Sequence, residues 1–306
     1  MDLRRKTANV VHRANKLGKK LFPRTHAIWY SRYHSGIRKT LSQTDGPRHY
    51  DSEEVFEKLQ QGYPPRSRYA YDKYSTWERG TKRALNLLNS EVFREPGLNV
   101  LEAGCGDGMA GYALACYGHK VTLVDLEDWR DERAKKLPFV AGDLCAKLPL
   151  DPESHEVIVS YQTFEHLEDP AKSLAELVRI CKTGGHIYLR FGPLYASPWG
   201  LHAYRTLHMP YPQFLFSETF INQKLQELGI YDLGQQRTSL QPLNRWKLSR
   251  FSRLWRESDC EIISYSELTD DSHLNLIKEY PKAFSGRELA FKDVVTQAIS
   301  VMLRKR

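Results

Sequence analysis

The chain has 306 residues, which is enough for two ordinary domains or for one α/β domain with additions. Hydrophobic residues make up 41% and charged residues 27%, with a mean hydropathy of −0.56. This composition excludes a disordered or collagen-like chain. The sequence has no apolar run of about 18 residues and no signal-peptide core, so we expect no membrane span. Its five cysteines form no CxxC pair, which favours a reducing, cytoplasmic location.

The charge of +8 is concentrated at the N-terminus. Residues 1–50 contain 12 Lys and Arg against two Asp, a net charge of +10, whereas residues 51–306 contain 33 against 35. We predict peripheral contact of residues 1–50 with an anionic membrane, and nucleic-acid phosphate is the weaker alternative. An organelle transit peptide and a solvated basic helix, with its apolar stripe at Val10, Ala14, Leu17 and Leu21, are the other interpretations.

From residue 66 onward, apolar strands alternate with helical stretches. We predict that residues 1–65 are a basic extension and a linker, with turns over 40–66. Residues 66–306 are predicted to form a single domain. We expect helices over 66–92, 109–117 and 170–181, and another from residue 244. Seven strands are expected over 99–103, 120–126, 139–143, 156–161, 186–191, 261–265 and 299–303. Strands separated by helices predict an α/β fold, a doubly wound and mostly parallel sheet.

The first expected strand leads into a loop with glycines at alternate positions, 104, 106 and 108. Such a loop can turn tightly and bring its backbone against a ligand at the start of the next helix. A dinucleotide site would need a third glycine at the position that Met109 occupies, so an NAD(P) dehydrogenase becomes the weaker interpretation.

Acidic residues close the next two expected strands. Asp125 ends the second strand, where a carboxylate can accept both hydroxyls of a ribose, and Asp143 ends the third, where it can accept an adenine amino group. Leu126 and Leu144 follow them and can enclose the base. Each acid alone could equally be a helix N-cap, but together with the glycine loop they predict a nucleoside site.

These motifs resemble the class I S-adenosylmethionine-dependent methyltransferases, in particular the type 11 group. VLEAGCGDG resembles their cofactor loop, LVDL the ribose-binding strand end, and AGDLCAKLPL the adenine-binding turn. SHEVIVSYQTFEHLEDP and LVRICKTGGHIYLRF resemble the fourth and fifth strands. The resemblance implies a seven-stranded Rossmann-like fold with S-adenosylmethionine as cofactor, and no metal. It implies these cofactor-binding residues: Glu102, Gly104, Cys105, Gly106, Gly108, Asp125, Leu126, Asp143, Leu144 and Tyr161.

An oxygen acceptor also needs a base. We predict that His166, in the loop after the fourth strand, is this base and that Glu165 beside it also has a catalytic role. His202 is the other candidate for the base. The alternative interpretation is that the Glu-His pair caps or packs the next helix.

Between the fifth strand and the following helix lies an aromatic insertion over residues 192–244, expected to be an acceptor-binding lid. Tyr195, Trp199 and Tyr204 are its predicted contacts, although such rings could simply seal a satellite core. GPLYASPWGLHAY and MPYPQFLFSE resemble methyltransferases of bacterial surface-glycan and related biosynthetic clusters. We therefore predict methylation of a small-molecule or saccharide acceptor, on oxygen, in glycan or secondary-metabolite biosynthesis. An RNA methyltransferase and a non-catalytic cofactor-binding module are the alternatives, and no oligomeric state is predicted.

Overall fold

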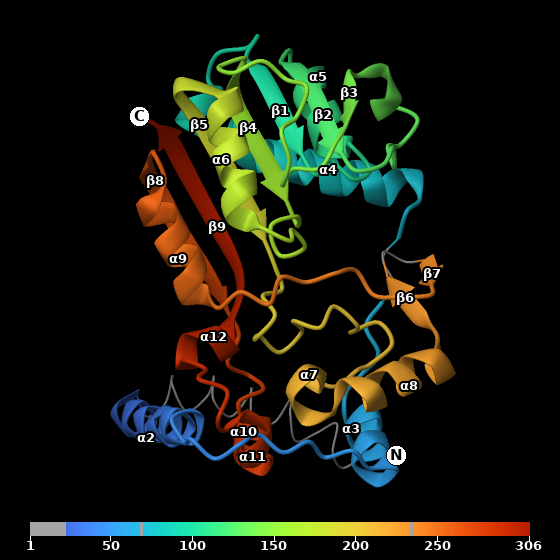
Figure 1. The fold of residues 1–306 in the computed structure, drawn as a ribbon, viewed down its shortest axis with the longest axis vertical. Coiled ribbons are helices and arrows are strands. Elements are labelled where there is room, and N and C mark those ends of the chain that lie inside the picture. Colours follow the sequence, from blue (N-terminus) through green and yellow to red (C-terminus); the bar gives the residue numbers. More distant parts are fainter. Residues whose placement is uncertain (1–22, 68–69, 233–234) are drawn as a thin grey trace. The chain divides into compact units, whose positions relative to one another are not determined.

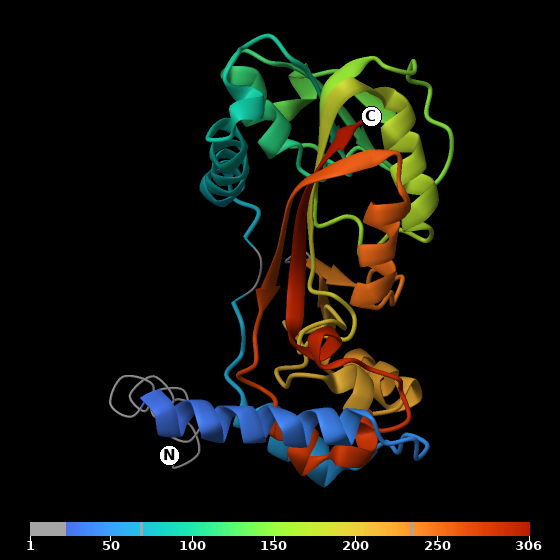
Figure 2. The ribbon, with the colours of Figure 1, turned by 90° about the vertical axis from the view of Figure 1, so that its left-hand side faces the viewer.

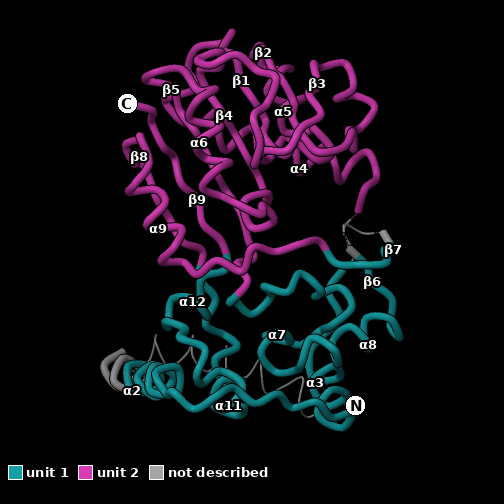
Figure 3. Tube along the Cα trace, viewed as in Figure 1, with its two compact units in different colours: residues 1–68, 196–240, 269–297 teal, residues 69–195, 241–268, 298–306 magenta. Residues whose placement is uncertain are grey.

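The computed structural model describes residues 23–67, 70–232 and 235–306, and the chain forms two compact units (Figure 3). Unit 1 combines residues 1–68, 196–240 and 269–297, and unit 2 combines 69–195, 241–268 and 298–306. Each unit is therefore built from separate stretches of the sequence.

Unit 2 contains a seven-stranded sheet in the order β3-β2-β1-β4-β5-β9-β8 (Figure 1). The five strands from β3 to β5 in this order are parallel, and β9 runs antiparallel to β5. The strands span Asn99–Ala103 (β1), Lys120–Asp125 (β2), Phe139–Ala141 (β3), His155–Tyr161 (β4), Cys181–Phe191 (β5), Cys260–Thr269 (β8) and Thr296–Lys305 (β9). The predicted α/β, mostly parallel, Rossmann-like sheet is thus confirmed.

Helices cover both faces of this sheet (Figure 2). On one face lie α4 (Lys73–Leu88) and α5 (Met109–Cys116), and on the other lie α6 (Pro170–Ile180) and α9 (Leu248–Glu257). Short 3₁₀ turns follow α4 at Glu91–Phe93 and precede β3 at Ala134–Lys136. Because β-strand side chains alternate between faces, neighbouring residues of each central strand enter different cores. In β1, Val100 packs toward α4 and α5, whereas Leu101 packs toward α6 and α9.

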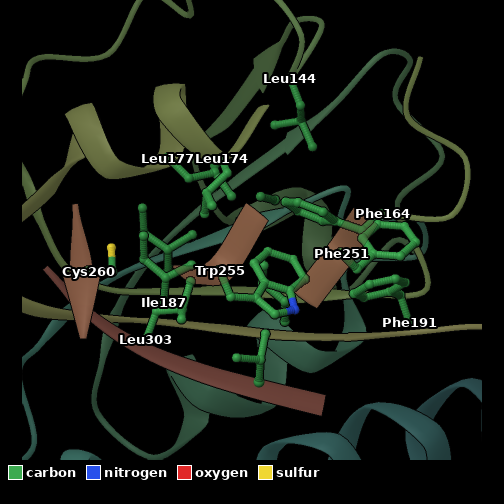
Figure 4. Packing of buried hydrophobic residues seen from close by; sticks show 14 of the residues in the cluster. Leu144, Phe164, Leu174, Leu177, Ile187, Phe191, Phe251, Trp255, Cys260 and Leu303 are labelled. Atoms are coloured by element: carbon green, nitrogen blue, oxygen red, sulfur yellow. The ribbon is translucent and has the colours of Figure 1, made fainter. Parts of the chain in front are cut away.

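The core beneath α6 and α9 is largely aromatic (Figure 4). Phe191 of β5 lies 4.9 Å from the ring of Phe251, and Phe251 stacks against Trp255 at 6.1 Å. Phe164, in the loop after β4, packs against Phe191 and Trp255. This packing holds the β4 loop against α9 and so limits where the next two residues, Glu165 and His166, can lie.

Unit 1 consists of helices and a two-stranded sheet. Tyr211 is fully buried, and its hydroxyl donates to the carbonyl of Val294 at 2.9 Å, which joins two of the unit's sequence segments. The helices are α2 (Pro23–Leu41), α3 (Glu53–Gly62), α7 (Pro212–Leu215), α8 (Glu218–Leu228), α10 (Asn275–Glu279), α11 (Pro281–Phe284) and α12 (Phe291–Val295), and the strands are β6 (Ile230–Asp232) and β7 (Gln235–Arg237).

The prediction of a linker over residues 40–66 is wrong for its second half. Residues 53–62 form α3, whose buried Phe56 and Leu59 lie on one face. Phe56 packs edge-on against Phe216 and Phe220 of the same unit. The Gly-, Ser- and Gln-rich composition of this stretch gave no sign of the helix, which is amphipathic and is stabilised by tertiary packing.

Other boundaries differ less. The helix expected over residues 66–92 begins at Lys73, because Asp72 caps it by accepting from the backbone N–H groups of Tyr74 and Ser75. Residues 196–240 of the expected insertion belong to unit 1, as do 269–297, which the sequence analysis placed in the main domain.

The stripe from Val10 to Leu21 lies outside the described residues. Among the described helices, none combines the length and the apolar character that a bilayer span requires.

The contact between α4 and α5 depends on Gly80. A Cβ atom added there would lie 2.4 Å from the backbone oxygen of Met109. We expect Gly80→Ala to lower the free energy of unfolding by about 1–3 kcal/mol, although alanine favours a helix. Urea unfolding followed by circular dichroism measures this change. Gly62→Ala, where an added Cβ meets nothing within 4 Å, is the control; equal stability of the two variants would contradict the assigned packing.

Candidate cofactor site

The glycine loop follows β1 at the carboxyl edge of the sheet, and its three glycines serve different needs. Gly104, Gly106 and Gly108 all have positive φ angles, of 71°, 52° and 68°. A Cβ on Gly104 would lie 2.3 Å from the hydroxyl oxygen of Thr163, so this glycine is required by the β4 loop behind it. A Cβ on Gly106 would meet nothing within 4 Å, so its backbone borders open space. This is the position where a ligand can approach the main chain.

Asp125, at the end of β2, holds that loop in place. Its Oδ2 accepts from the backbone N–H of Gly106 at 2.8 Å, and its Oδ1 accepts from the N–H of Leu126 at 2.8 Å. Burial raises the pKa of this carboxyl, and the two hydrogen bonds oppose the rise. Each carboxylate oxygen has a second lone pair, so the group can accept further donors such as ribose hydroxyls.

Glu102 lies in β1 with 1% of its surface exposed. Its Oε2 accepts from the backbone N–H of Gly111 in α5 at 2.7 Å. Burial raises the pKa of Glu102 to about 8, against the opposing effects of that hydrogen bond and of the Arg83 guanidinium. Glu102 therefore links β1 to α5, and its burial favours the protonated form.

The other predicted cofactor contacts lie at neighbouring strand ends of unit 2. Asp143 is exposed, and its Oδ1 accepts from the N–H of Cys145 at 2.8 Å. Leu126 is 67% exposed, whereas Leu144 is buried in the aromatic core. Cys105 is also buried, and burial raises the pKa of its thiol. The structure thus brings these residues to one edge of the sheet, and of the predicted contacts only Leu126 and Asp143 are exposed.

Arg83 lies beside Glu102 and Tyr161, and the sequence analysis did not single it out. Its guanidinium carbon lies 5.0 Å above the ring of Tyr161, and the Tyr161 hydroxyl donates to the Arg83 carbonyl. The same guanidinium lowers the pKa of both Glu102 and Glu165 by electrostatic attraction. Within the described residues it forms no hydrogen bond or ion pair. The sequence offered one signal for Arg83. Gly80, Ala84 and Leu87 mark the buried face of α4, and Arg83 is a half-buried cation beside that face.

Glu165 and His166 lie in the loop after β4. Glu165 is 3% exposed; its Oε1 accepts from the N–H of Gly192 at 3.0 Å, and burial raises its pKa. The Nδ1 of His166 lies 2.8 Å from the carbonyl oxygen of Pro242. Since a carbonyl can only accept, Nδ1 carries a proton. The neutral ring then has its lone pair on Nε2, which lies 4.0 Å from Oε1 of Glu165.

The predicted acceptor contacts do not all belong to one unit. Tyr195 lies in unit 2, where the Arg245 guanidinium is 5.1 Å from its ring centre. Trp199 and Tyr204 lie in unit 1 with ring centres 6.5 Å apart. His202 also lies in unit 1, is 8% exposed and has a left-handed backbone with φ of 62°. The roles of these residues remain predictions.

Comparison with known proteins agrees with this arrangement. The family described as "Methyltransferase domain" matches residues 101–189, from β1 to β5. These residues form a class I S-adenosylmethionine-dependent methyltransferase domain. The domain takes S-adenosylmethionine as its cofactor.

Relatives match over the same region. A protein of Mycobacterium tuberculosis named "Probable S-adenosylmethionine-dependent methyltransferase" is 34% identical over 91 residues, 28% of this chain and 33% of its own. The mitochondrial ubiquinone biosynthesis O-methyltransferase of Schizosaccharomyces pombe is 30% identical over 135 residues, 37% of this chain and 48% of its own. The chain thus spans between a third and a half of the length of these curated relatives.

Solved methyltransferase structures are more distant. An S-adenosylmethionine-dependent methyltransferase from Mesorhizobium loti aligns with a TM-score of 0.45 and 18% identity, covering 74% of this chain and 98% of its own.

The buried Glu102 makes stability dependent on pH. Its carboxyl holds a proton up to a pKa of about 8 in the folded chain, compared with 4.5 when unperturbed. The folded state therefore binds more protons between these values, and the contribution of Glu102 to stability falls as the pH rises from about 4.5 to 8. The Glu102→Gln side chain does not titrate, so the variant lacks this loss of stability. We therefore expect the difference in melting temperature, variant minus wild type, to increase from pH 5 to pH 9. Thermal melts across this range test it, with exposed Glu168→Gln as the control; a constant difference would contradict the assignment.

Proposed function

We propose that the chain transfers the methyl group of S-adenosylmethionine to an oxygen of a small-molecule or saccharide acceptor in a biosynthetic pathway. The new bond joins the methyl carbon to the acceptor oxygen while the carbon–sulfur bond of the sulfonium breaks. S-adenosylhomocysteine leaves, and the acceptor proton passes to a base. The observation that carries the choice of oxygen is the ring orientation of His166, since an oxygen acceptor needs a base and a nitrogen acceptor need not have one.

The cofactor would lie along the carboxyl edge of the sheet. In this proposal Asp125 accepts from the ribose hydroxyls, Asp143 from the adenine amino group, and the open backbone at Gly106 borders the methionine part. Arg83 receives the methionine carboxylate: its guanidinium has no bonded partner among the described residues and lies close to Glu102 and Tyr161. A fork of donors on Arg suits a carboxylate that accepts two parallel hydrogen bonds.

His166 is the proposed base. Donation of Nδ1–H to Pro242 fixes the ring so that Nε2 can accept a proton, and the adjacent Glu165 carboxyl stabilises the imidazolium that forms. The phenylalanine before this pair, Phe164, is locked in the aromatic core, so the pair is held by a rigid support. The Schizosaccharomyces pombe relative, which is named as a ubiquinone biosynthesis O-methyltransferase, supports oxygen as the methylated atom.

The cofactor contacts can be separated by comparing two ligands. Adenosine has the ribose and adenine of S-adenosylhomocysteine but no carboxylate. We expect Asp125→Ala to weaken both ligands and Arg83→Gln to weaken S-adenosylhomocysteine alone, each by about 10- to 100-fold, because a hydrogen bond to a charged group is worth about 1.5–3 kcal/mol. Isothermal titration calorimetry measures these affinities.

Two neighbouring substitutions are matched controls for this experiment. Lys82→Gln removes an exposed cation beside Arg83, and Glu127→Ala removes an exposed acid two residues beyond Asp125. Both should bind the two ligands as the wild type does. If Arg83→Gln weakened adenosine as much as S-adenosylhomocysteine, Arg83 would not hold the carboxylate.

The proposed reaction is tested by transfer of labelled methyl from S-adenosylmethionine into a cell extract, with the purified chain added. We expect label in a pool that resists nuclease and protease. His166→Ala should lower the rate by about 10²- to 10⁴-fold, because it removes the base. Its affinity for S-adenosylhomocysteine should stay unchanged.

His186→Ala, in β5 opposite Val157 and Arg304, is the control histidine. A normal rate in His166→Ala would exclude His166 as the base. Label that nuclease removes would replace the proposed acceptor with RNA, and no incorporation into any pool would favour a cofactor-binding module.

A further inference from the structure

The last strand of the large sheet, β8, is hydrogen-bonded to one neighbour. In the strand order β3-β2-β1-β4-β5-β9-β8 it lies at the end, next to β9 (Figure 1). A strand in this position has backbone N–H and C=O groups on its outer side that its own sheet does not pair. β8 has ten residues, and nearly all of them are exposed. It therefore presents a long edge to which another strand can add.

Large apolar side chains project from both faces of this strand. Ile262, Ile263, Tyr265 and Leu268 are all exposed, from 37% for Tyr265 to 56% for Leu268. Because successive side chains of a strand point to opposite faces, Ile262 and Leu268 lie on one face and Ile263 and Tyr265 on the other. Apolar surface gathered in this way is unfavourable in water and is typical of an interaction site.

The two edges of the sheet differ in how they are protected. Proteins discourage strand addition at an edge by keeping the strand short or by placing Lys or Pro in it. At the other end of the sheet, β3 has only three residues, and Pro138 precedes it. β8 contains no Lys, Arg, Pro or Gly, and its two charged residues, Glu261 and Glu267, are both acidic. This contrast indicates that a strand from another molecule covers β8.

We propose that β8 pairs antiparallel with β8 of a second copy of this chain, so that the two sheets join into one. The two-fold axis passes beside Tyr265, and each residue lies opposite the one at equal distance on the other side of Tyr265. Residues paired in this way are both even-numbered or both odd-numbered, so the outward backbone groups of the two copies meet. Such an assembly stops at two copies, because both use the same edge.

The sequence of β8 is complementary to itself in this register. Ile262 lies opposite the partner's Leu268, and Leu268 lies opposite the partner's Ile262. Between them, Ser264 lies opposite the partner's Ser266, and the two Tyr265 side chains are neighbours across the axis. Apolar, aromatic and hydroxyl pairs that lie directly opposite each other stabilise an antiparallel ladder. A second copy of the chain therefore meets the requirements of this edge.

The two acids of β8 disfavour the register with its axis one residue earlier. If the axis passed beside Ser264, Glu261 would lie opposite the partner's Glu267, and like charges directly opposite are destabilising. With the axis beside Tyr265, neither acid lies opposite another acid. Glu261 is also neutralised within its own chain, because Arg304 of β9 forms an ion pair with it.

This pairing is independent of the proposed function. Residues 261–268, which carry it, all belong to unit 2 and include none of the predicted cofactor contacts. Those contacts lie at or after the ends of β1 to β4, which are separated from β8 by β5 and β9. Self-association and cofactor binding can therefore be confirmed or overturned separately.

The mass of the full chain, measured by light scattering and analytical ultracentrifugation over a range of concentrations, tests the proposal. We expect the wild type to reach twice the chain mass of 35.5 kDa. Ile262→Lys and Leu268→Glu each place a charge against an apolar side chain, twice in a symmetric dimer. Each should raise the dimer Kd by about 10-fold. Leu85→Lys on α4, at a residue of similar exposure, is the matched control and should leave the Kd unchanged.

Mixing the two variants tests the register itself. In a mixed dimer the new lysine of one copy lies opposite the new glutamate of the other, and the second Ile262–Leu268 pair is native. The mixture should therefore associate about 10-fold more tightly than either variant does alone. Circular dichroism checks that each variant is folded. If a charged variant is not, Ile262→Ser and Leu268→Ser remove the apolar contact without adding charge and should also weaken the dimer.

Three outcomes would overturn the proposal. A wild type that stays monomeric at every concentration would do so, and would leave β8 to a strand of a different protein. A dimer whose Kd is the same in the wild type and in both variants would use another surface. A mixture that associates no better than the separate variants would exclude the pairing of Ile262 with the partner's Leu268.

Discussion

The site depends on two carboxyl groups that hold the glycine loop between the strand ends and α5. Asp125 of β2 accepts from the backbone of Gly106, and Glu102 of β1 accepts from the backbone of Gly111. Glycines at alternate positions make the loop flexible in the unfolded chain, so ordering it costs conformational entropy. The two hydrogen bonds to charged or buried carboxyl groups offset that cost. They also leave the open face of Gly106 in a fixed position.

Crowding behind the loop complements these bonds. The Cβ position of Gly104 is filled by Thr163, and that of Gly111 by Leu123 and the carboxyl of Glu102. The loop therefore has close contacts on the protein side and open space only at Gly106. A backbone held in this way binds a ligand without further ordering, which is the physical meaning of a preorganised site.

The sheet was predictable because its strands are short apolar runs separated by helical stretches, and the first three expected strands lead into a glycine or an acid. Asp125 followed from the same logic, as the acid that ends a strand. Arg83 could not be predicted in this way, because α4 brings it beside Tyr161 and its neighbours in sequence give no sign of that contact. Likewise α3 escaped prediction: Phe56 is only one apolar residue among polar ones until Phe216 and Phe220 pack against it.

The aromatic insertion shows more clearly that contacts between residues distant in sequence could not be predicted. The sequence analysis predicted Trp199 and Tyr204 as acceptor contacts in one insertion, but neither Arg66 nor His273, which also contact Trp199, is close to them in the chain. Stacking an arginine on a buried indole uses the aromatic surface that a planar or sugar-like acceptor would need. The proposed role of these rings thereby shifts from contacting an acceptor directly to orienting a cation.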